Sequence, residues 1–138
     1  MTNRNLYKTA GSSIGMIPKE IKAMVDELKN NNEVAAIYLF GSYAKGKPKP
    51  YSDVDICVIT PKISKYVQRK ILSYSSSKVD LSLFDQLPLY IQYRVFKDGK
   101  ALFVRNPLQL QQIKVKTTLH YLDFKPLLMR HFKKVLAS

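Results

Sequence analysis

Hydrophobic and polar positions recur with two periods along the chain, and together they predict alternating helices and strands. After Pro18, apolar residues recur at helical spacing until the asparagines at 30–32. The segment from Glu33 to Phe40 is apolar and rich in strand-forming residues. We expect further strands at 52–60, 79–84 and 101–105, and further helices at 61–72, 87–96 and 107–136, the last bent at Pro126.

The strands expected at 52–60 and 79–84 are apolar on one side and more polar on the other. A sheet with this pattern carries helices on its apolar face and leaves the opposite face open. We therefore expect an α+β (α/β) fold with one functional face. Residues 17–138 are expected to form this single domain, and the polar residues 1–16 a flexible N-terminal lead-in.

Three aspartates lie on the polar side of these strands. Asp53 and Asp55 are two residues apart on one predicted strand, so they project to the same face. Asp80 lies on the polar side of the next strand, and the three carboxylates converge if the two strands are neighbours. Carboxylates so close raise one another's pKa unless a cation neutralises them. Their oxygens suit Mg²⁺ or Mn²⁺, although an isolated Asp-x-Asp is also common as a pair of solvated acids.

A glycine-serine turn, in the sequence GSYAKG, directly follows the first predicted strand. Gly41 permits a tight turn and a close backbone approach, while Ser42 and the following N–H groups can bind phosphate oxygens. An ordinary strand-to-loop turn has a similar composition. The turn lacks the Gly-Lys-Ser/Thr of a Walker loop and does not match a dinucleotide-binding fingerprint.

The turn and the aspartates together form a longer pattern: GSYAKG, the spacer KPKPY, then SDVD and a downstream VDL. This pattern resembles the active-site signature of the DNA polymerase β-type nucleotidyltransferase superfamily. It is most similar to that of the minimal nucleotidyltransferases, which are often paired with HEPN-domain proteins as antitoxins. A weaker likeness continues through FKDGKALFVR and YLDFKPLL. One departure is Tyr43, at a position where many members have Arg.

The resemblance implies a fold, a set of site residues and cofactors. The fold would be a small mixed sheet of the polymerase β type. Asp53, Asp55 and Asp80 would be catalytic and would hold Mg²⁺, as two ions, with Mn²⁺ as an alternative. Asp80 would be the general base. The nucleotide, ATP or another NTP, would be bound by four further residues: Gly41, Ser42, Lys45 and Ser52. Lys47 is a second candidate for the charge that Tyr43 does not supply.

The implied reaction transfers a nucleoside monophosphate, AMP if the substrate is ATP, to a hydroxyl acceptor and releases pyrophosphate. The favoured acceptor is a tyrosine of a partner HEPN toxin, which would make this protein an antitoxin. A small molecule or an RNA end is an alternative acceptor, and a non-catalytic antitoxin that acts by binding is a third reading. No Arg of this chain is followed by a His after four to six intervening residues, the pattern of HEPN ribonucleases, so the chain would be the transferase half of such a pair.

The amino-acid composition restricts the partners and the cellular location that we expect. The 138 residues carry 23 Lys plus Arg against 10 Asp plus Glu, a net charge of +13, which favours polyanionic ligands or an acidic partner. A nucleic-acid partner is not favoured, because the nine tyrosines are scattered. The single cysteine excludes an intrachain disulfide, and no apolar run approaches the ~18 residues of a membrane span. We expect a cytoplasmic protein, and homo-oligomerisation stays open.

The segment 108–136 combines apolar residues with many basic ones. It is interpreted either as an amphipathic helix that closes the core or as a basic helix for an acidic partner or nucleic acid, and the first reading is favoured.

Overall fold

A computed structural model describes residues 19–46, 53–62 and 64–137. The expected order of elements is confirmed: α3 (Lys19–Leu28), β1 (Ala36–Phe40), β2 (Val54–Ile59), α4 (Lys65–Leu72), β3 (Val79–Leu83), the 3₁₀ turn η1 (Phe84–Gln86), α5 (Leu89–Asp98), β4 (Lys100–Val104) and α6 (Pro107–Ala137). The expected lead-in at 1–16, Lys47 and Ser52 lie outside the described residues. The helix α4 begins four residues after Pro61, because Ser64 caps it: the Ser64 hydroxyl oxygen accepts a hydrogen bond from the Val67 N–H.

The four strands form one mixed sheet in the order β3-β2-β1-β4. The strand β1 pairs antiparallel with both β2 and β4, whereas β2 and β3 are parallel and are connected through α4. A parallel pair needs such a crossover connection, and the helix in it packs back on the sheet. The expected α+β fold with a small mixed sheet is therefore confirmed.

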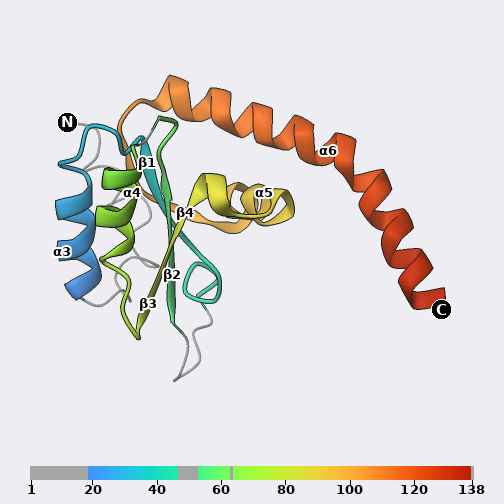
Figure 1. The fold of residues 1–138 in the computed structure, drawn as a ribbon, viewed down its shortest axis with the longest axis horizontal. Helices are drawn as coiled ribbons and strands as arrows, with labels where there is room; N and C mark the ends of the chain where they lie inside the picture. The colour runs from blue at the N-terminus through green and yellow to red at the C-terminus, as the bar shows by residue number, and fades with distance from the viewer. Residues whose placement is uncertain (1–18, 47–52, 63, 138) are drawn as a thin grey trace.

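Helices lie on both faces of the sheet, and this corrects the expectation that one face would be open (Figure 1). The helices α3 and α4 pack on the face that carries Ile37, Ile56 and Leu81. On the other face, Tyr38 and Cys57 are buried in a second apolar cluster with residues of α5 and α6. The alternation in β2 becomes apolar on both sides after Asp55, so only the beginning of the strand has the polar face that the sequence predicted.

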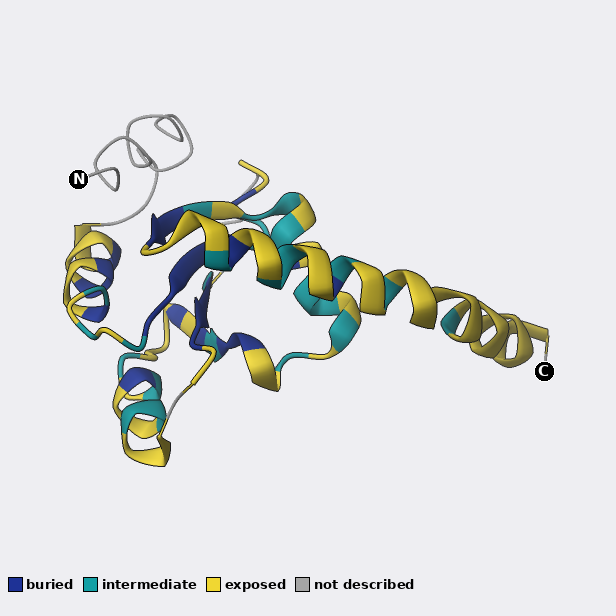
Figure 2. Cartoon of the chain, turned by 90° about the horizontal axis from the view of Figure 1, so that it is seen from above, coloured by how far each residue is buried: buried dark blue, intermediate teal, exposed yellow. Residues whose placement is uncertain are grey.

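The helix α6 covers the sheet with its first part and then extends away from it (Figure 1). Leu110 and Thr117 are buried, and Tyr121 stacks on Tyr93 of α5 with the ring centroids 4.1 Å apart. The distal part is coloured as exposed along most of its length in Figure 2. The helix continues through Pro126 and changes direction in the part that contains this residue, as a missing N–H and a crowded carbonyl require. No helix among the described residues is both long and apolar enough to cross a bilayer.

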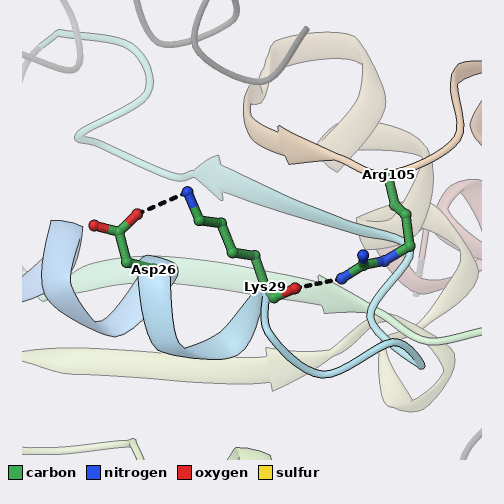
Figure 3. A network of polar contacts seen from close by, with 3 residues as sticks. All are labelled: Asp26, Lys29 and Arg105. Carbon is green, nitrogen blue, oxygen red and sulfur yellow. Dashed lines mark hydrogen bonds and ion pairs between the residues drawn. The ribbon is translucent and has the colours of Figure 1, made fainter. Parts of the chain in front are cut away.

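Arg105, directly after β4, connects this edge of the sheet to the end of α3 (Figure 3). Its guanidinium donates hydrogen bonds to three carbonyl oxygens. One belongs to Lys29, one to Asn31 at 3.1 Å and one to Val34 at 2.9 Å. Carbonyl groups at a helix C-terminus have no partner within the helix, so a basic side chain there satisfies them. The Lys29 side chain in turn forms an ion pair with Asp26.

Candidate active site

Two of the three aspartates lie side by side on the sheet. Asp55 and Asp80 are Cα partners in the parallel register of β2 and β3, which confirms that these strands are neighbours. Strand parity directs both side chains to the face of α5 and α6, because Val54 and Ile56 face α3 and α4. Asp53 immediately precedes β2 and is exposed. The structure thus brings Asp55 and Asp80 together, and Asp53 is near enough for its charge to raise the pKa of Asp55.

The electrostatics of Asp55 reflect this crowding. The side chain is half-buried, and its pKa is raised from 3.8 to about 6, first by burial and then by the negative charges of Asp80 and Asp53. A divalent cation would relieve this repulsion and return the carboxylate to its ionised form.

Gly41 stands against Asp55, where the sheet meets the glycine-serine turn. Phe40 pairs with Asp55 across β1 and β2, so the residue after Phe40 meets the Asp55 side chain. Gly41 has φ +76°, and a Cβ placed on it would lie 2.2 Å from Oδ2 of Asp55. Glycine is required here both for its left-handed backbone and for the space that the carboxylate occupies.

The other residues of the turn differ in what their side chains contact. Ser42 is half-buried and Lys45 is exposed, and the Lys45 N–H donates to the Gly41 carbonyl at 3.3 Å. Tyr43, by contrast, packs against the apolar cluster on the side of α3 and α4. It therefore points away from the face that carries Asp55 and Asp80.

The donor set fits a divalent cation in its chemistry. Carboxylates supply hard oxygen ligands, and the pKa of Asp55 is raised by burial first and then by the neighbouring negative charges that such an ion would neutralise. Within the described part of the chain, no three or more His, Cys, Asp and Glu side chains lie so that they could together hold a metal ion. Ligand roles for Asp53, Asp55 and Asp80 therefore stay predictions.

Sequence reasoning missed the contribution of α5. This helix places Ile91, Arg94 and Asp98 beside Phe40, Gly41 and Lys45, and the six residues line a hollow of about 250 Å³. Arg94 follows the glycine turn by some fifty residues, and no motif relates them, so the contact is visible only in the folded chain. A wider hollow of about 420 Å³ is lined by residues of α6 and lies away from the carboxylates.

The polymerase beta, nucleotidyltransferase family model matches residues 22–108, which contain both the glycine turn and the three aspartates. The chain belongs to this family. A Methanocaldococcus jannaschii protein that is assigned as a protein adenylyltransferase is 38% identical to this chain over 72 residues. That match covers 52% of this chain and 57% of the relative, so the chain spans little more than half of the relative's length.

Solved structures show the same fold. A crystal structure of a toxin-antitoxin with AMP-PNP superposes with a TM-score of 0.66 at 24% identity, covering 86% of this chain and 97% of the other. A structure of a tri-AMPylated Shewanella oneidensis HEPN toxin in complex with an MNT antitoxin gives a TM-score of 0.62 at 24% identity, covering 85% and 95%. At this level of identity the likeness establishes the fold.

Proposed function

We propose that this member of the polymerase beta family is an Mg²⁺-dependent adenylyltransferase that modifies a partner HEPN-domain protein. The observation that carries the proposal is the placement of Asp55 and Asp80 side by side, with Asp53 nearby and Gly41 in contact distance of Asp55. The names of the relatives support the chemistry and the partner: one is assigned as a protein adenylyltransferase, and another structure holds an AMPylated HEPN toxin with its antitoxin.

The chain's own residues account for the steps of this reaction. Ser42 and the N–H groups after Gly41 would bind the β- and γ-phosphates of ATP, and Lys45 would offset their charge. Ser52 is a further predicted contact. Asp80 would accept the proton of the acceptor hydroxyl. The oxygen of that hydroxyl then bonds to the α-phosphorus as pyrophosphate leaves.

Asp53, Asp55 and Asp80 would hold the metal. Bound there, Mg²⁺ would neutralise phosphate charge and make the acceptor hydroxyl more acidic. Two ions are expected, and Mn²⁺ is the alternative metal. The cytoplasmic setting that we propose agrees with Cys57, which is a buried free thiol.

A protein acceptor is favoured by the surface of α6. The distal part of this helix is exposed along most of its length (Figure 2). From Leu119 onward the helix exposes a set of large apolar side chains: Leu119, Leu122, Leu127, Met129, Phe132 and Leu136. Apolar groups gathered on one exposed element mark protein interaction sites. We propose a tyrosine of the HEPN-domain partner as the acceptor, a feature that a small-molecule acceptor would not need.

The experiment is incubation with α-labelled ATP, Mg²⁺ and the product of the neighbouring gene. We expect label on the partner, its loss with EDTA, and its loss in Asp53→Ala. The matched control is Asp26→Ala, which removes an exposed carboxylate from α3, on the other side of the sheet. Label found only on RNA or a small molecule would exclude the protein acceptor, and binding of the partner without label would exclude the enzyme.

A further inference from the structure

The hollow between the glycine turn and α5 opens on the same face of the sheet as the aspartates. Phe40 and Gly41 form its floor, next to Asp55, and Ile91, Arg94 and Asp98 form its wall. Its volume of about 250 Å³ is large enough for part of a nucleotide. A ligand in it would touch both the turn and α5.

The hollow is lined by two cations from different elements. Lys45 comes from the turn and Arg94 from α5. Asp98 forms an ion pair with Arg94, in which Nε and Oδ2 are 3.7 Å apart and the Arg94 side chain is 59% exposed. A surface pair of this length and exposure contributes little, so Arg94 can exchange it for a more highly charged anion.

We propose that Arg94 is a phosphate-binding residue, which holds the terminal phosphates of the nucleotide against the glycine turn. This rests on the proposed function. The turn itself contributes no guanidinium, because Tyr43 occupies its third position and packs toward α3 and α4. Arg94 approaches the same turn from α5 instead, and its planar fork of donors binds phosphate oxygens in pairs.

The role of Arg94 follows from the place where negative charge develops during the reaction. When the acceptor oxygen bonds to the α-phosphorus, the bond from that phosphorus to the bridging oxygen breaks and its electron pair leaves with pyrophosphate. Lys45 belongs to the turn that would bind these phosphates and Arg94 lies beside it, so both cations would stabilise the leaving group. Arg94 therefore acts on the triphosphate and not on the base.

The test compares Arg94→Gln with Lys97→Gln, which removes the same charge from the same helix but does not line the hollow. Binding of AMP, ADP and a non-hydrolysable ATP analogue is measured with Mg²⁺ present. We expect Arg94→Gln to weaken binding of the ATP analogue by about ten- to a hundredfold and to leave AMP binding unchanged. Arg94→Lys should restore part of the loss, because it keeps the charge without the fork.

Two results of the binding measurements would overturn the assignment. Equal losses for AMP, ADP and the ATP analogue would place the base or ribose at Arg94, and an Arg94→Gln protein that binds like Lys97→Gln would remove it from the site. Failure of the proposed function is distinguishable: the wild type would then bind ATP in an Arg94-dependent way and label no acceptor. A wild type that labels its partner, with the KM for ATP unchanged in Arg94→Gln, would refute this inference alone.

Discussion

Gly41 and Asp55 are held together by the pairing of β1 with β2, and neither residue can change without affecting the other. The left-handed backbone of Gly41 is one constraint, and the Asp55 carboxylate, 2.2 Å from the place of a Cβ, is another. Gly46 is subject to the backbone constraint alone. It has φ +69° in the same turn, but nothing lies within 4 Å of its Cβ position.

We therefore predict different outcomes for alanine at the two glycines. Gly46→Ala should cost about 1 kcal/mol of the free energy of unfolding, from backbone strain alone, and keep most of the transfer activity. Gly41→Ala should also displace the Asp55 carboxylate, because the new methyl group would occupy its place. A displacement of a catalytic group by about 1 Å lowers kcat by roughly a hundredfold. Urea unfolding and labelling assays on both variants measure this. Similar activities in the two would show that contact with Asp55 is unimportant.

A second prediction concerns the charge of Asp55 without metal. Its pKa in the folded chain, about 6, lies above the ordinary value of 3.8, so the folded state binds this proton more tightly than the unfolded state. The contribution of Asp55 to stability therefore falls as the pH rises from about 4 to about 6, and the full cost is present above that range. Asp55→Asn removes this cost.

In EDTA at about pH 8, Asp55→Asn should be more stable than the wild type by about 1 kcal/mol, after allowance for solvent screening of this half-exposed group. The difference should vanish toward pH 4. Urea midpoints across this range test it. Adding Mg²⁺ should stabilise the wild type and not the variant, while a variant less stable than the wild type in EDTA at pH 8 would contradict the account.

The aspartates could be predicted from the sequence because strand parity depends only on local alternation. Asp55 and Asp80 share a face for that reason, on the two strands that the sequence indicated. Arg94 could not be predicted. Its position beside Gly41 depends on how α5 packs on the sheet, which no local pattern of the chain encodes.

At the scale of elements, α6 departs most from its favoured interpretation. Its first part closes the core as expected, through Leu110, Thr117 and the stacking of Tyr121 on Tyr93. Beyond Tyr121 the apolar side chains are mostly exposed, because the sheet and α5 end before the helix does (Figure 1). Periodicity predicts an apolar face but does not determine what covers it.

We predict that the double substitution Leu119→Gln with Leu122→Gln weakens capture of the HEPN-domain partner at least tenfold. Both leucines are more than half exposed, so the fold should keep its stability while the apolar contact area is lost. Tyr66→Gln is the matched control, since it removes an exposed apolar residue from α4. Binding is measured by calorimetry, alongside affinity for the ATP analogue. Unchanged capture would assign the partner to another surface.

At the scale of the whole molecule, the sequence predicted the order of elements but not the layers. The parallel pairing of β2 with β3 follows from the helical connection between them. The covering of the second face does not, because Tyr38 and Cys57 are ambiguous in the pattern: a tyrosine and a cysteine can each face solvent or a core. Both are almost fully buried.

The strand β1 lies in the middle of the sheet, so it cannot be paired on both sides until most of the chain has been synthesised. Its antiparallel neighbours lie at very different distances along the chain: Phe40 pairs with Asp55, whereas Leu39 pairs with Lys100, which is made much later. A nascent chain that has emerged only as far as β3 exposes one edge of an apolar strand, AIYLF, and lacks α5 as well. Such an edge invites pairing with other chains. The newly made protein is thus most vulnerable to aggregation just before the strand that encloses β1 leaves the ribosome.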